Sequence, residues 1–521
     1  MLTPAPDYAA LCDGFAWDMP ERLNMAHQVC DGWAVRDPGR VAIIDVTDGI
    51  RRQISYGELW RLSRRVENAL LERGVMRGDR VGVLLSQSFL CAAAHIAAWR
   101  IGAISVPLFK LFRGEALGAR LDDSGASVVV TDDDGAAMVR GMGLAVIRQQ
   151  DLPDSTQASG GVETGPDDPA VLIYTSGTTG APKGALHGHR VLTGHLPGVE
   201  MSHDFLGQPG DCLWTPADWA WIGGLFDVLM PGLALGVPVV AARMEKFTPK
   251  GATRIVDQGG VRNAFFPPTA LRMLKAADCQ VTGLRSVASG GEPLGAEMLD
   301  WGRGAFGLTI NEFYGQTECN MVASSAGVLF DPRPGFIGRP APGHRVAVID
   351  AAGDITDGEG DIAVRAGTPA MMLEYWRKPQ ATAEKFRGQW MLTGDRGVME
   401  DGFIRFVGRE DDVITSAGYR IGPAEIEDCL LTHPAVATVG VVGKPDRLRT
   451  QIVKAYVVVK EGVGADDALA DALKSWVKER LAAHSYPREI AFLDVLPMTV
   501  TGKVIRKDLK ARATQEAEGE A

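Results

Sequence analysis

The densest group of potential phosphate ligands in this chain is the segment Tyr174–Gly184, which reads YTSGTTGAPKG. Hydroxyl groups and a lysine can bind phosphate oxygens, and glycines permit tight turns that point backbone N–H groups at an anion. The segment directly follows an apolar run, Val171–Tyr174, that we expect to be a strand. Lys183 is followed by glycine, so the GxxxxGK[ST] pattern of a P-loop ATPase or kinase is not met. The sequence therefore predicts a phosphate-binding loop of another kind.

Six further segments carry charged and small residues in short clusters. They are Ser289–Pro293 (SGGEP), Glu312–Glu318 (EFYGQTE), Leu392–Asp395 (LTGD), Gly408–Asp412 (GREDD), Ser416–Glu425 (SAGYRIGPAE) and Thr499–Lys503 (TVTGK). Together with the first segment and in this order, they resemble the signature motifs of the adenylate-forming superfamily, which contains acyl-CoA synthetases, luciferases and peptide-synthetase adenylation domains. The chain is most similar to the branch of acetyl-CoA and short- to medium-chain acyl-CoA synthetases.

The resemblance implies a first step that joins a carboxylate to the α-phosphate of ATP and releases pyrophosphate. A carboxyl group with a pKa near 4 is already ionised at neutral pH, so this step needs no general base. Catalysis must come from orienting two anions and neutralising their charge. The resemblance gives catalytic roles to Lys503, which bridges carboxylate and phosphate, to Thr317, which binds the α-phosphate, and to Glu318, which holds Mg²⁺.

The resemblance also implies a complete ATP site. Tyr314 lies against the adenine, Asp395 accepts the ribose hydroxyls, and Arg409 reaches the ribose and phosphate. The implied ATP-binding residues are Thr175, Ser176, Gly177, Thr178, Thr179, Gly180, Lys183, Gly291, Glu292, Pro293, Glu312, Phe313, Tyr314, Gly315, Gln316, Thr317, Asp395, Arg409 and Lys503.

A second step, attack of the CoA thiol on the acyl-adenylate, is implied by the same resemblance, with rotation of a small domain about the hinge Asp411. The residues implied for CoA are Ala417, Gly418 and Tyr419 around the pantetheine and Arg449, Tyr486 and Arg488 at the nucleotide. The nearest alternative is an enzyme that loads a carrier-protein phosphopantetheine, which brings no adenine nucleotide for the two arginines to bind. A P-loop ATPase or kinase and a non-catalytic nucleotide-binding protein are the alternatives of other classes.

The acyl pocket is expected around a tryptophan-rich segment, 214–224. The pocket residues implied by the resemblance are Trp221, Gly223, Gly224, Gly290, Gly315 and Arg420. In acetate-specific relatives a tryptophan stands where this chain has Gly315, so we expect room for acids longer than acetate. Each buried methylene would add about 0.8 kcal/mol to binding. No basic residue is evidently placed to pair with a second carboxylate, which favours a monocarboxylic acid.

The elements that position these motifs follow from alternating apolar patterns. Strands are expected at 41–45, 81–85, 127–131, 171–175, 237–241 and 286–288, and helices at 56–73 and 88–100. This alternation predicts an α/β fold, with a large N-terminal domain of layered, mainly parallel sheets and helices. A small, mobile α+β domain should follow, with helices near 423–431 and 466–482 and strands at 435–442, 452–459 and 489–494. We place the domains at 1–410 and 411–521 and expect a frayed C-terminus.

The composition is that of an ordinary globular protein of 521 residues, with 46% hydrophobic and 23% charged residues. The 54 basic and 65 acidic residues give a net charge of −11, which argues against nucleic-acid or membrane partners. No apolar stretch is long enough to span a bilayer, and the N-terminus lacks the features of a signal peptide. Seven dispersed cysteines are typical of reduced thiols, so the expected location is cytoplasmic.

Two features of the sequence raise the question of further partners, namely enzymes that modify a lysine and a metal ion. The stretch Pro497–Lys503 resembles a site acetylated in related synthetases, so a lysine acetyltransferase and a deacetylase are expected to act on Lys503. Four histidines between His187 and His203 could in principle bind zinc, but their spacing matches no defined ligand pattern. The small-molecule partners expected are a carboxylic acid, ATP and CoA. The sequence does not indicate the oligomeric state.

Overall fold

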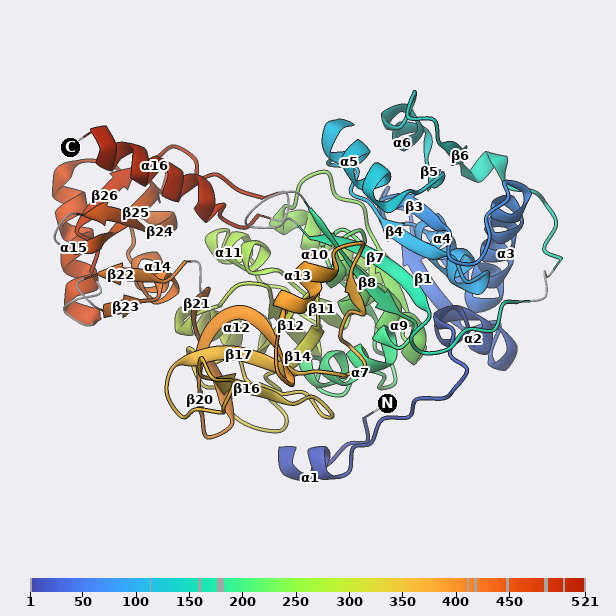
Figure 1. The fold of residues 1–521 in the computed structure, drawn as a ribbon, viewed down its shortest axis with the longest axis horizontal. Helices are drawn as coiled ribbons and strands as arrows, with labels where there is room; N and C mark the ends of the chain where they lie inside the picture. The colour runs from blue at the N-terminus through green and yellow to red at the C-terminus, as the bar shows by residue number, and fades with distance from the viewer. Residues whose placement is uncertain are drawn as a thin grey trace.

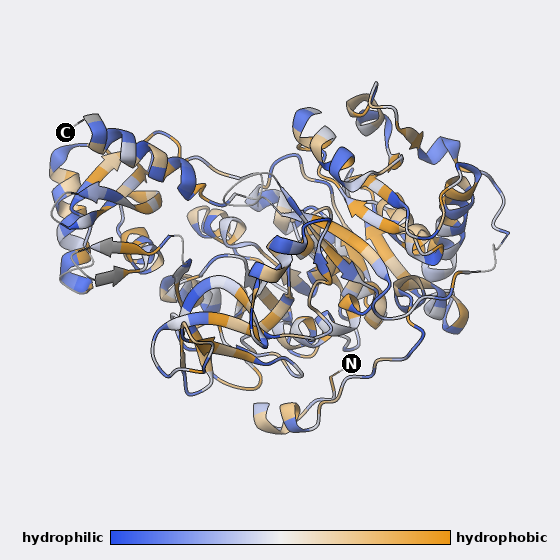
Figure 2. Ribbon diagram, in the orientation of Figure 1, coloured by the Kyte–Doolittle hydropathy of each residue, from blue (hydrophilic) through white to orange (hydrophobic). Residues whose placement is uncertain are grey.

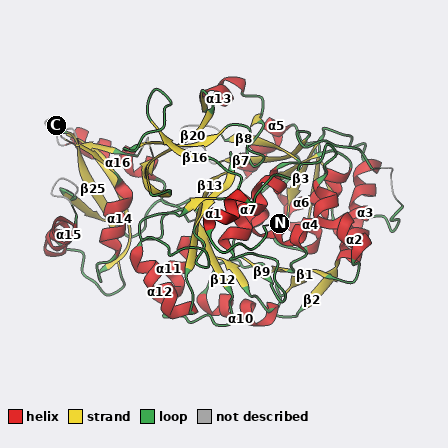
Figure 3. Ribbon diagram, turned by 90° about the horizontal axis from the view of Figure 1, so that it is seen from below, coloured by secondary structure: helices red, strands yellow, loops and turns green. Residues whose placement is uncertain are grey.

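The structure is a computed structural model that describes residues 2–112, 114–157, 161–175, 182–409, 412–416, 419–446, 449–481, 486–499 and 502–519. A large N-terminal domain contains three β-sheets, and a smaller C-terminal domain with its own sheet lies at one end of the molecule (Figure 1). The same separation is visible in the view from below (Figure 3). The predicted fold class is therefore confirmed.

The first sheet has nine strands, and its six central strands run parallel. Its order is β15 (Arg339–Pro340), β14 (Asn320–Ser324), β13 (Ile310–Gln316), β12 (Ser286–Gly290), β11 (Asn263–Phe265), β9 (Leu213–Trp214), β10 (Val239–Ala241), β1 (Val41–Asp45) and β2 (Arg52–Ser55). The carboxyl ends of parallel strands meet at one edge of a sheet, where ligands of α/β proteins bind. The ends of β12 and β13 bring two of the predicted motifs to that edge.

The second sheet has seven strands, and five of them are parallel. Its order is β18 (Glu374–Tyr375), β8 (Lys183–Gly188), β7 (Pro169–Thr175), β4 (Ile104–Pro107), β3 (Arg80–Leu84), β5 (Val128–Thr131) and β6 (Ala145–Ile147). Strands β7 and β8 form an antiparallel pair in which Thr175 lies opposite Lys183. The two ends of the predicted phosphate loop are thus held side by side.

Helices fill the space between these two sheets and cover their outer faces. Every residue of α4 (Phe89–Arg100) after Phe89 is buried, and its side chains pack with those of both sheets in the largest apolar cluster. Strands in the interior are correspondingly hydrophobic (Figure 2). The other helices before the third sheet are α1 (Tyr8–Asp13), η1 (His27–Asp31), α2 (Gly32–Arg36), α3 (Tyr56–Glu72), α5 (Gly114–Ser124), α6 (Asp133–Met138), η2 (Gln149–Asp151), α7 (Val191–Ser202), α8 (Ile222–Gly224), η3 (Leu225–Leu229), α9 (Met230–Leu235), α10 (Pro249–Gly259), α11 (Pro268–Ala276) and α12 (Ala296–Phe306).

The third sheet differs from the expected parallel pattern because all of its pairings are antiparallel. It consists of β16 (Val346–Ile349), β17 (Gly360–Arg365), β20 (Trp390–Glu400), β19 (Phe386–Arg387) and β21 (Phe403–Arg409), with α13 (Pro379–Glu384) beside it. Short turns connect strands that are consecutive in the chain, and such connections produce antiparallel neighbours. Strand β20 carries Asp395 and β21 ends at Arg409, so this sheet supplies two of the predicted ATP-binding residues.

The small domain packs three helices against a five-stranded sheet. Its strands are β23 (Tyr419–Ile421), β22 (Ile414–Ser416), β25 (Thr450–Val459), β24 (Val436–Asp446) and β26 (Glu489–Phe492), and its helices are α14 (Pro423–Leu431), α15 (Asp467–Arg480) and α16 (Arg506–Gly519). The expected frayed C-terminus is wrong, because α16 buries Leu509 and Ala513 and packs along β24. Glu516 fixes its end by accepting hydrogen bonds from Lys454 and Tyr456.

Most predicted elements appear at the expected positions, with bounds that differ by a few residues. All seven cysteines are free thiols. No helix within the described part of the chain has the length and apolarity required to cross a membrane.

Candidate active site

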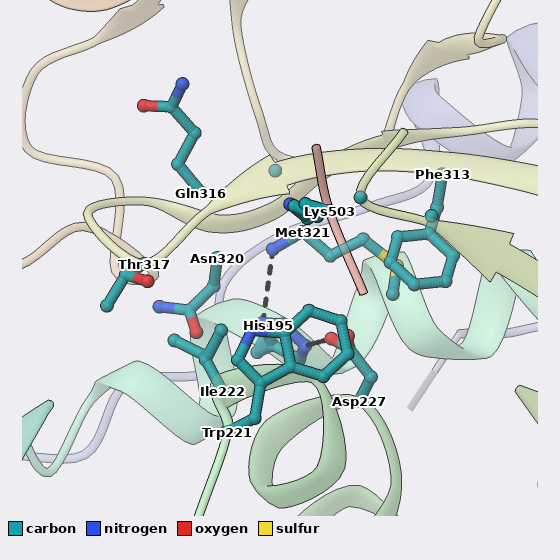
Figure 4. Close-up of a pocket in the computed structure, with 13 residues that line it drawn as sticks. His195, Trp221, Ile222, Asp227, Phe313, Gln316, Thr317, Asn320, Met321 and Lys503 are labelled. Atoms are coloured by element: carbon teal, nitrogen blue, oxygen red, sulfur yellow. Dashed lines mark hydrogen bonds and ion pairs between the residues drawn. The ribbon is translucent and has the colours of Figure 1, made fainter. Parts of the chain in front are cut away.

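A cavity of about 100 Å³ lies where the carboxyl ends of β12 and β13 meet the turn that precedes α16 (Figure 4). Its walls come from the large domain, and one residue comes from the small domain. The lining residues are His195, Trp221, Ile222, Asp227, Gly290, Gly291, Phe313, Gly315, Gln316, Thr317, Asn320, Met321 and Lys503. Residues from three predicted motifs, Ser289–Pro293, Glu312–Glu318 and Thr499–Lys503, are thus gathered with residues that no motif contains.

Lys503 reaches the cavity from a tight turn. Thr499 and Lys503 close this turn through two hydrogen bonds, 2.7 Å from Thr499 N to Lys503 O and 3.0 Å from Lys503 N to Thr499 Oγ1. Gly502 has φ +82°, a conformation that residues with a side chain rarely adopt. The ammonium group lies against Gly291, where Nζ is 3.5 Å from the position of an added Cβ. Burial lowers the pKa of Lys503, while the charges of Glu292 and Asp395 raise it.

Asp395 is the centre of a second group of predicted ATP-binding residues. Tyr314 Oη and Gln316 Nε2 donate hydrogen bonds to Asp395 Oδ2 over 2.5 and 2.8 Å, and Arg409 Nη1 lies 3.8 Å from Oδ1. Burial raises the pKa of Asp395, and the Arg409 charge opposes this shift. The arrangement unites β13, β20 and β21, so three separate motifs meet at one carboxylate.

Glu318 and Lys183 both contact the side chain of Tyr375. Tyr375 Oη donates a 2.5 Å hydrogen bond to Glu318 Oε1, and Lys183 Nζ lies 5.3 Å from the centre of the Tyr375 ring. Thr175 Oγ1 donates to Lys183 O over 3.3 Å. The predicted loop residues Ser176, Gly177, Thr178, Thr179 and Gly180 lie outside the described residues. A strand, β8, follows the loop, whereas a P-loop is followed by a helix, which agrees with the failed P-loop pattern.

The remaining predicted ATP residues form the edge of the cavity and the boundary with the small domain. Thr317 and Gly291 line the cavity, with Pro293 close by in the chain, and Glu292 pairs with Arg272 over 2.5 Å. Glu312 is buried, and desolvation together with the charge of Asp428 in α14 raises its pKa to about 8. Two carboxylates from different domains thus act on each other here.

Two aromatic rings form the wall of the predicted acyl pocket. A Cβ on Gly290 would lie 2.4 Å from the Phe313 ring, and one on Gly223 would lie 2.6 Å from the Trp221 ring. Glycine is therefore required for this close packing. Gly223 and Gly224 stand behind the wall, since neither lines the cavity, and Phe313 contributes to the wall.

The expectation that the missing side chain of Gly315 enlarges the acyl pocket is wrong. Gly315 lines the cavity, but a Cβ there would lie 1.8 Å from the backbone oxygen of Asn320. The pairing of β13 with β14 is irregular at this point, and the backbone of β14 occupies the space that a side chain would take. The absent side chain therefore does not enlarge the pocket.

The predicted CoA residues lie in the small domain. Arg488 Cζ lies 5.2 Å from the centre of the Tyr486 ring, so these two residues form one surface, and Asp446 Oδ1 accepts a hydrogen bond from Arg449 N. Tyr419 belongs to β23, and Ala417 and Gly418 lie outside the described residues, as does Asp411.

The expected place of Arg420 in the acyl pocket stays a prediction. This residue belongs to β23, a strand of the small domain.

The four clustered histidines do not converge on one site. His203 Nδ1 is 2.9 Å from Ser286 Oγ, and His189 Nδ1 accepts a hydrogen bond from Met25 N. His187 is buried beside the backbone of Thr317. No metal-binding group of three His, Cys, Asp or Glu residues is present in the described ranges.

Sequence reasoning missed the cavity residues His195 and Asp227. His195 Nε2 lies 2.6 Å from Asp227 Oδ1, and both side chains line the cavity. They come from α7 and η3, which are mostly apolar segments, so the available signal was a few ionisable residues, His195 and Glu200 in α7 and Asp227 in η3.

Comparison with known proteins agrees with this site. Residues 30–376 match the family model of AMP-binding enzymes, and residues 425–503 match the model of the AMP-binding enzyme C-terminal domain. The acetyl-coenzyme A synthetase of Bacillus subtilis is 33% identical over 94% of this chain and 90% of its own length.

Two solved structures share the fold of the whole chain. The Brucella canis acyl-CoA synthetase is 33% identical with a TM-score of 0.74, covering 98% of this chain and 100% of its own. An anthranilate CoA ligase in complex with anthranoyl-AMP is 25% identical with a TM-score of 0.87, covering 96% and 99%. The chain belongs to the AMP-binding enzyme family, and within that family it is an acyl-CoA synthetase, an AMP-forming acid–thiol ligase.

Proposed function

We propose that this enzyme activates a short- to medium-chain monocarboxylic acid with ATP and transfers the acyl group to CoA. The observation that supports this assignment best is the entry of Lys503 into a cavity walled by Trp221 and Phe313. Lys503 is the one lysine or arginine among the described residues that line this cavity, so a single carboxylate has a cationic partner there. The free cysteines suit a reducing compartment, and we place the enzyme in the cytoplasm.

In the first step, the substrate carboxylate attacks the α-phosphorus of ATP and pyrophosphate leaves. Lys503 lies between the acyl cavity and the group around Asp395, so its charge offsets both anions as they meet. Thr317 donates to the α-phosphate from the rim of the cavity. Asp395, with Tyr314 and Gln316 bonded to it, orients the ribose. Orientation and charge neutralisation thus account for the rate of this step.

Glu318 is the proposed Mg²⁺ ligand. Tyr375 donates a hydrogen bond to Glu318 Oε1 and so fixes the carboxylate, and Lys183 Nζ lies over the same tyrosine ring. A single fixed carboxylate beside phosphates suits Mg²⁺, which commonly takes one or two carboxylates and completes its coordination with phosphate oxygens and water. When bound, the ion would neutralise phosphate charge.

In the second step, the CoA thiol attacks the acyl carbonyl and AMP leaves. The Tyr486–Arg488 surface suits an adenine nucleotide, because arginine binds phosphate and stacks on aromatic faces. Residues 1–410 and 411–521 are the proposed moving units, with Asp411 as the hinge. Rotation would carry Lys503 out of the cavity and bring the face around Tyr419 towards it.

The assignment is tested by pyrophosphate release with acids from acetate to octanoate, and with branched and aromatic acids, each with and without CoA. Turnover that needs CoA and peaks above acetate is the expected result. A single stoichiometric burst that CoA does not change would favour a carrier-protein acceptor. No release with any acid would contradict the proposal.

The variant Arg488→Ala tests whether free CoA is the acceptor of the acyl group. We expect a raised KM for CoA and unchanged pyrophosphate release in the acid-dependent first step. Arg480→Ala is the matched control, because Arg480 also stacks on an aromatic ring of the small domain, 3.3 Å from the centre of Trp476. Equal effects of the two substitutions would argue against a CoA site at Arg488.

Reversible acetylation of Lys503 is proposed as a means of inactivation, because acetylation removes the positive charge. Lys503 lies against Gly291 in this conformation, so an acetyltransferase would need the small domain turned away. Unchanged adenylation by a fully acetylated sample would refute this proposal.

A further inference from the structure

The cavity has one polar pair in its wall that the proposed steps do not use. His195 and Asp227 lie below Lys503 in Figure 4, on a different side of the cavity. His195 comes from α7 and Asp227 from η3, so the pair connects two helical segments that are otherwise apolar at this point. Both residues line the cavity, so a bound molecule can contact this pair.

The protonation of His195 follows from its two neighbours. Met321 N lies 3.2 Å from His195 Nδ1, and a backbone N–H can only donate, so Nδ1 is the acceptor. The ring proton is then on Nε2, which donates to Asp227 Oδ1 over 2.6 Å. His195 is therefore neutral and donates to Asp227. Burial raises the pKa of Asp227, and the hydrogen bond from His195 opposes this shift.

The second oxygen of Asp227 is available to a ligand. Within the described ranges of the chain, Oδ2 has no hydrogen-bond partner and no lysine or arginine pairs with the carboxylate. The Asp227 side chain is 10% exposed and lines the cavity. Burying a carboxylate oxygen without a donor costs free energy, which a donor on a bound molecule would recover.

We propose that the acid activated by this enzyme carries a hydrogen-bond donor, a hydroxyl or an amino group, at the end remote from its carboxylate, and that Asp227 Oδ2 accepts the hydrogen bond. This inference rests on the proposed function. The substrate carboxylate lies at Lys503, the carbon chain passes the rings of Trp221 and Phe313, and the donor reaches Asp227.

The negative charge of Asp227 further limits which group the remote end of the substrate can carry. A cationic amino group would neutralise Asp227, and the neighbouring aromatic rings attract cations through their faces. A hydroxyl group would satisfy the hydrogen bond alone. A second carboxylate in the same place would meet a like charge, so Asp227 selects against dicarboxylic acids.

The test compares acids of equal length whose terminal methyl group is replaced by a hydroxyl or an amino group. One set is pentanoate, 4-hydroxybutanoate and 4-aminobutanoate, and the shorter set is butanoate, 3-hydroxypropanoate and 3-aminopropanoate. In the presence of ATP and CoA, we expect kcat/KM of one donor-bearing acid to exceed that of its alkyl partner by roughly tenfold or more. The order of the two donors distinguishes hydroxyl from amino substrates.

Two substitutions connect this preference to Asp227. Asp227→Leu should reverse it in favour of the alkyl acids. Asp227→Asn keeps an oxygen for His195 and presents an N–H₂ group to the cavity, so it should favour a tail that accepts, such as 3-methoxypropanoate. Glu200→Gln is the matched control, because Glu200 is a buried carboxylate of α7 that accepts from Leu2 N and does not line the cavity.

An active wild-type enzyme that prefers the alkyl acid at both lengths would overturn this inference alone. Retention of the donor preference in Asp227→Leu would do the same. If that variant fails to fold, the change of preference in Asp227→Asn decides the question. No pyrophosphate release with any acid, in either set or in the broader panel, would overturn the proposed function and this inference together.

Discussion

Replacing Lys503 with methionine is the most direct test of the proposed chemistry. Methionine keeps an unbranched side chain of similar length and removes the positive charge. Lys503 enters the cavity beside Gly291, within the electrostatic influence of Glu292 and Asp395. Without it, the described lining of the cavity contains no lysine or arginine to offset the two reacting anions.

The size of the effect follows from Coulomb's law. Two unit charges about 4 Å apart interact by about 4 kcal/mol at an effective dielectric constant near 20. A loss of this size in the transition state lowers the rate by about 10³-fold. This value agrees with the roughly 10²–10³-fold cost of removing one preorganised donor from an active site.

The assay separates the two steps. Acid-dependent pyrophosphate release should fall by about 10³-fold in Lys503→Met, while CoA acylation from a chemically prepared acyl-adenylate should continue at close to the wild-type rate. Lys507→Met is the matched control, because Lys507 is an exposed lysine of the adjoining helix. Pyrophosphate release by Lys503→Met at more than a tenth of the wild-type rate would refute the reasoning, as would equal losses in both steps.

Two further predictions concern packing and pH. Gly290→Ala should push the Phe313 ring into the cavity at a cost of about 1–3 kcal/mol and lower kcat/KM for the acid roughly 5- to 150-fold, with little change in KM for ATP. Gly304→Ala, where a Cβ meets open space, should leave both parameters unchanged, and equal results for the two variants would contradict this reasoning. Burial lowers the pKa of His203 to about 3, so the folded chain excludes a proton that the unfolded chain binds below about pH 6.5. The contribution of His203 to stability is full above that pH and falls by up to about 1.4 kcal/mol per pH unit towards pH 3. Urea unfolding of His203→Gln between pH 7 and pH 5 should show a shallower slope than wild type, and identical slopes would argue against a neutral buried His203.

The sequence was informative where local pattern determines structure. The alternation of strands and helices up to residue 290 follows from short apolar runs, such as Val41–Asp45, and from a helical stripe like that of α3. The motifs around Asp395 and Lys503 were visible because each is a compact cluster of unusual residues. Lys503 lines the cavity, and Gln316, which also lines it, donates a hydrogen bond to Asp395, in agreement with the resemblance from which these motifs were interpreted.

Features that depend on distant contacts could not be predicted. The acidic C-terminus reads as a polar tail, although Leu509 and Ala513, four residues apart, form one buried face of a helix. The missing side chain of Gly315 suggests a larger pocket, because the sequence does not show that the backbone of Asn320 fills this space. Asp227 and His195 lie 32 residues apart in apolar segments, and only the packing of α7 against η3 brings them together.

The facing carboxylates of Glu312 and Asp428 have a consequence for how long the two domains stay together. Glu312 is buried and Asp428 is half-buried at the boundary, and their pKa values are raised to about 8 and about 7. The closed arrangement must therefore either retain protons or bear the repulsion of two like charges. The two carboxyl groups therefore weaken the contact between the domains instead of strengthening it. The proposed rotation of the small domain in every turnover would gain from a boundary that separates readily, and the acidic pair provides one.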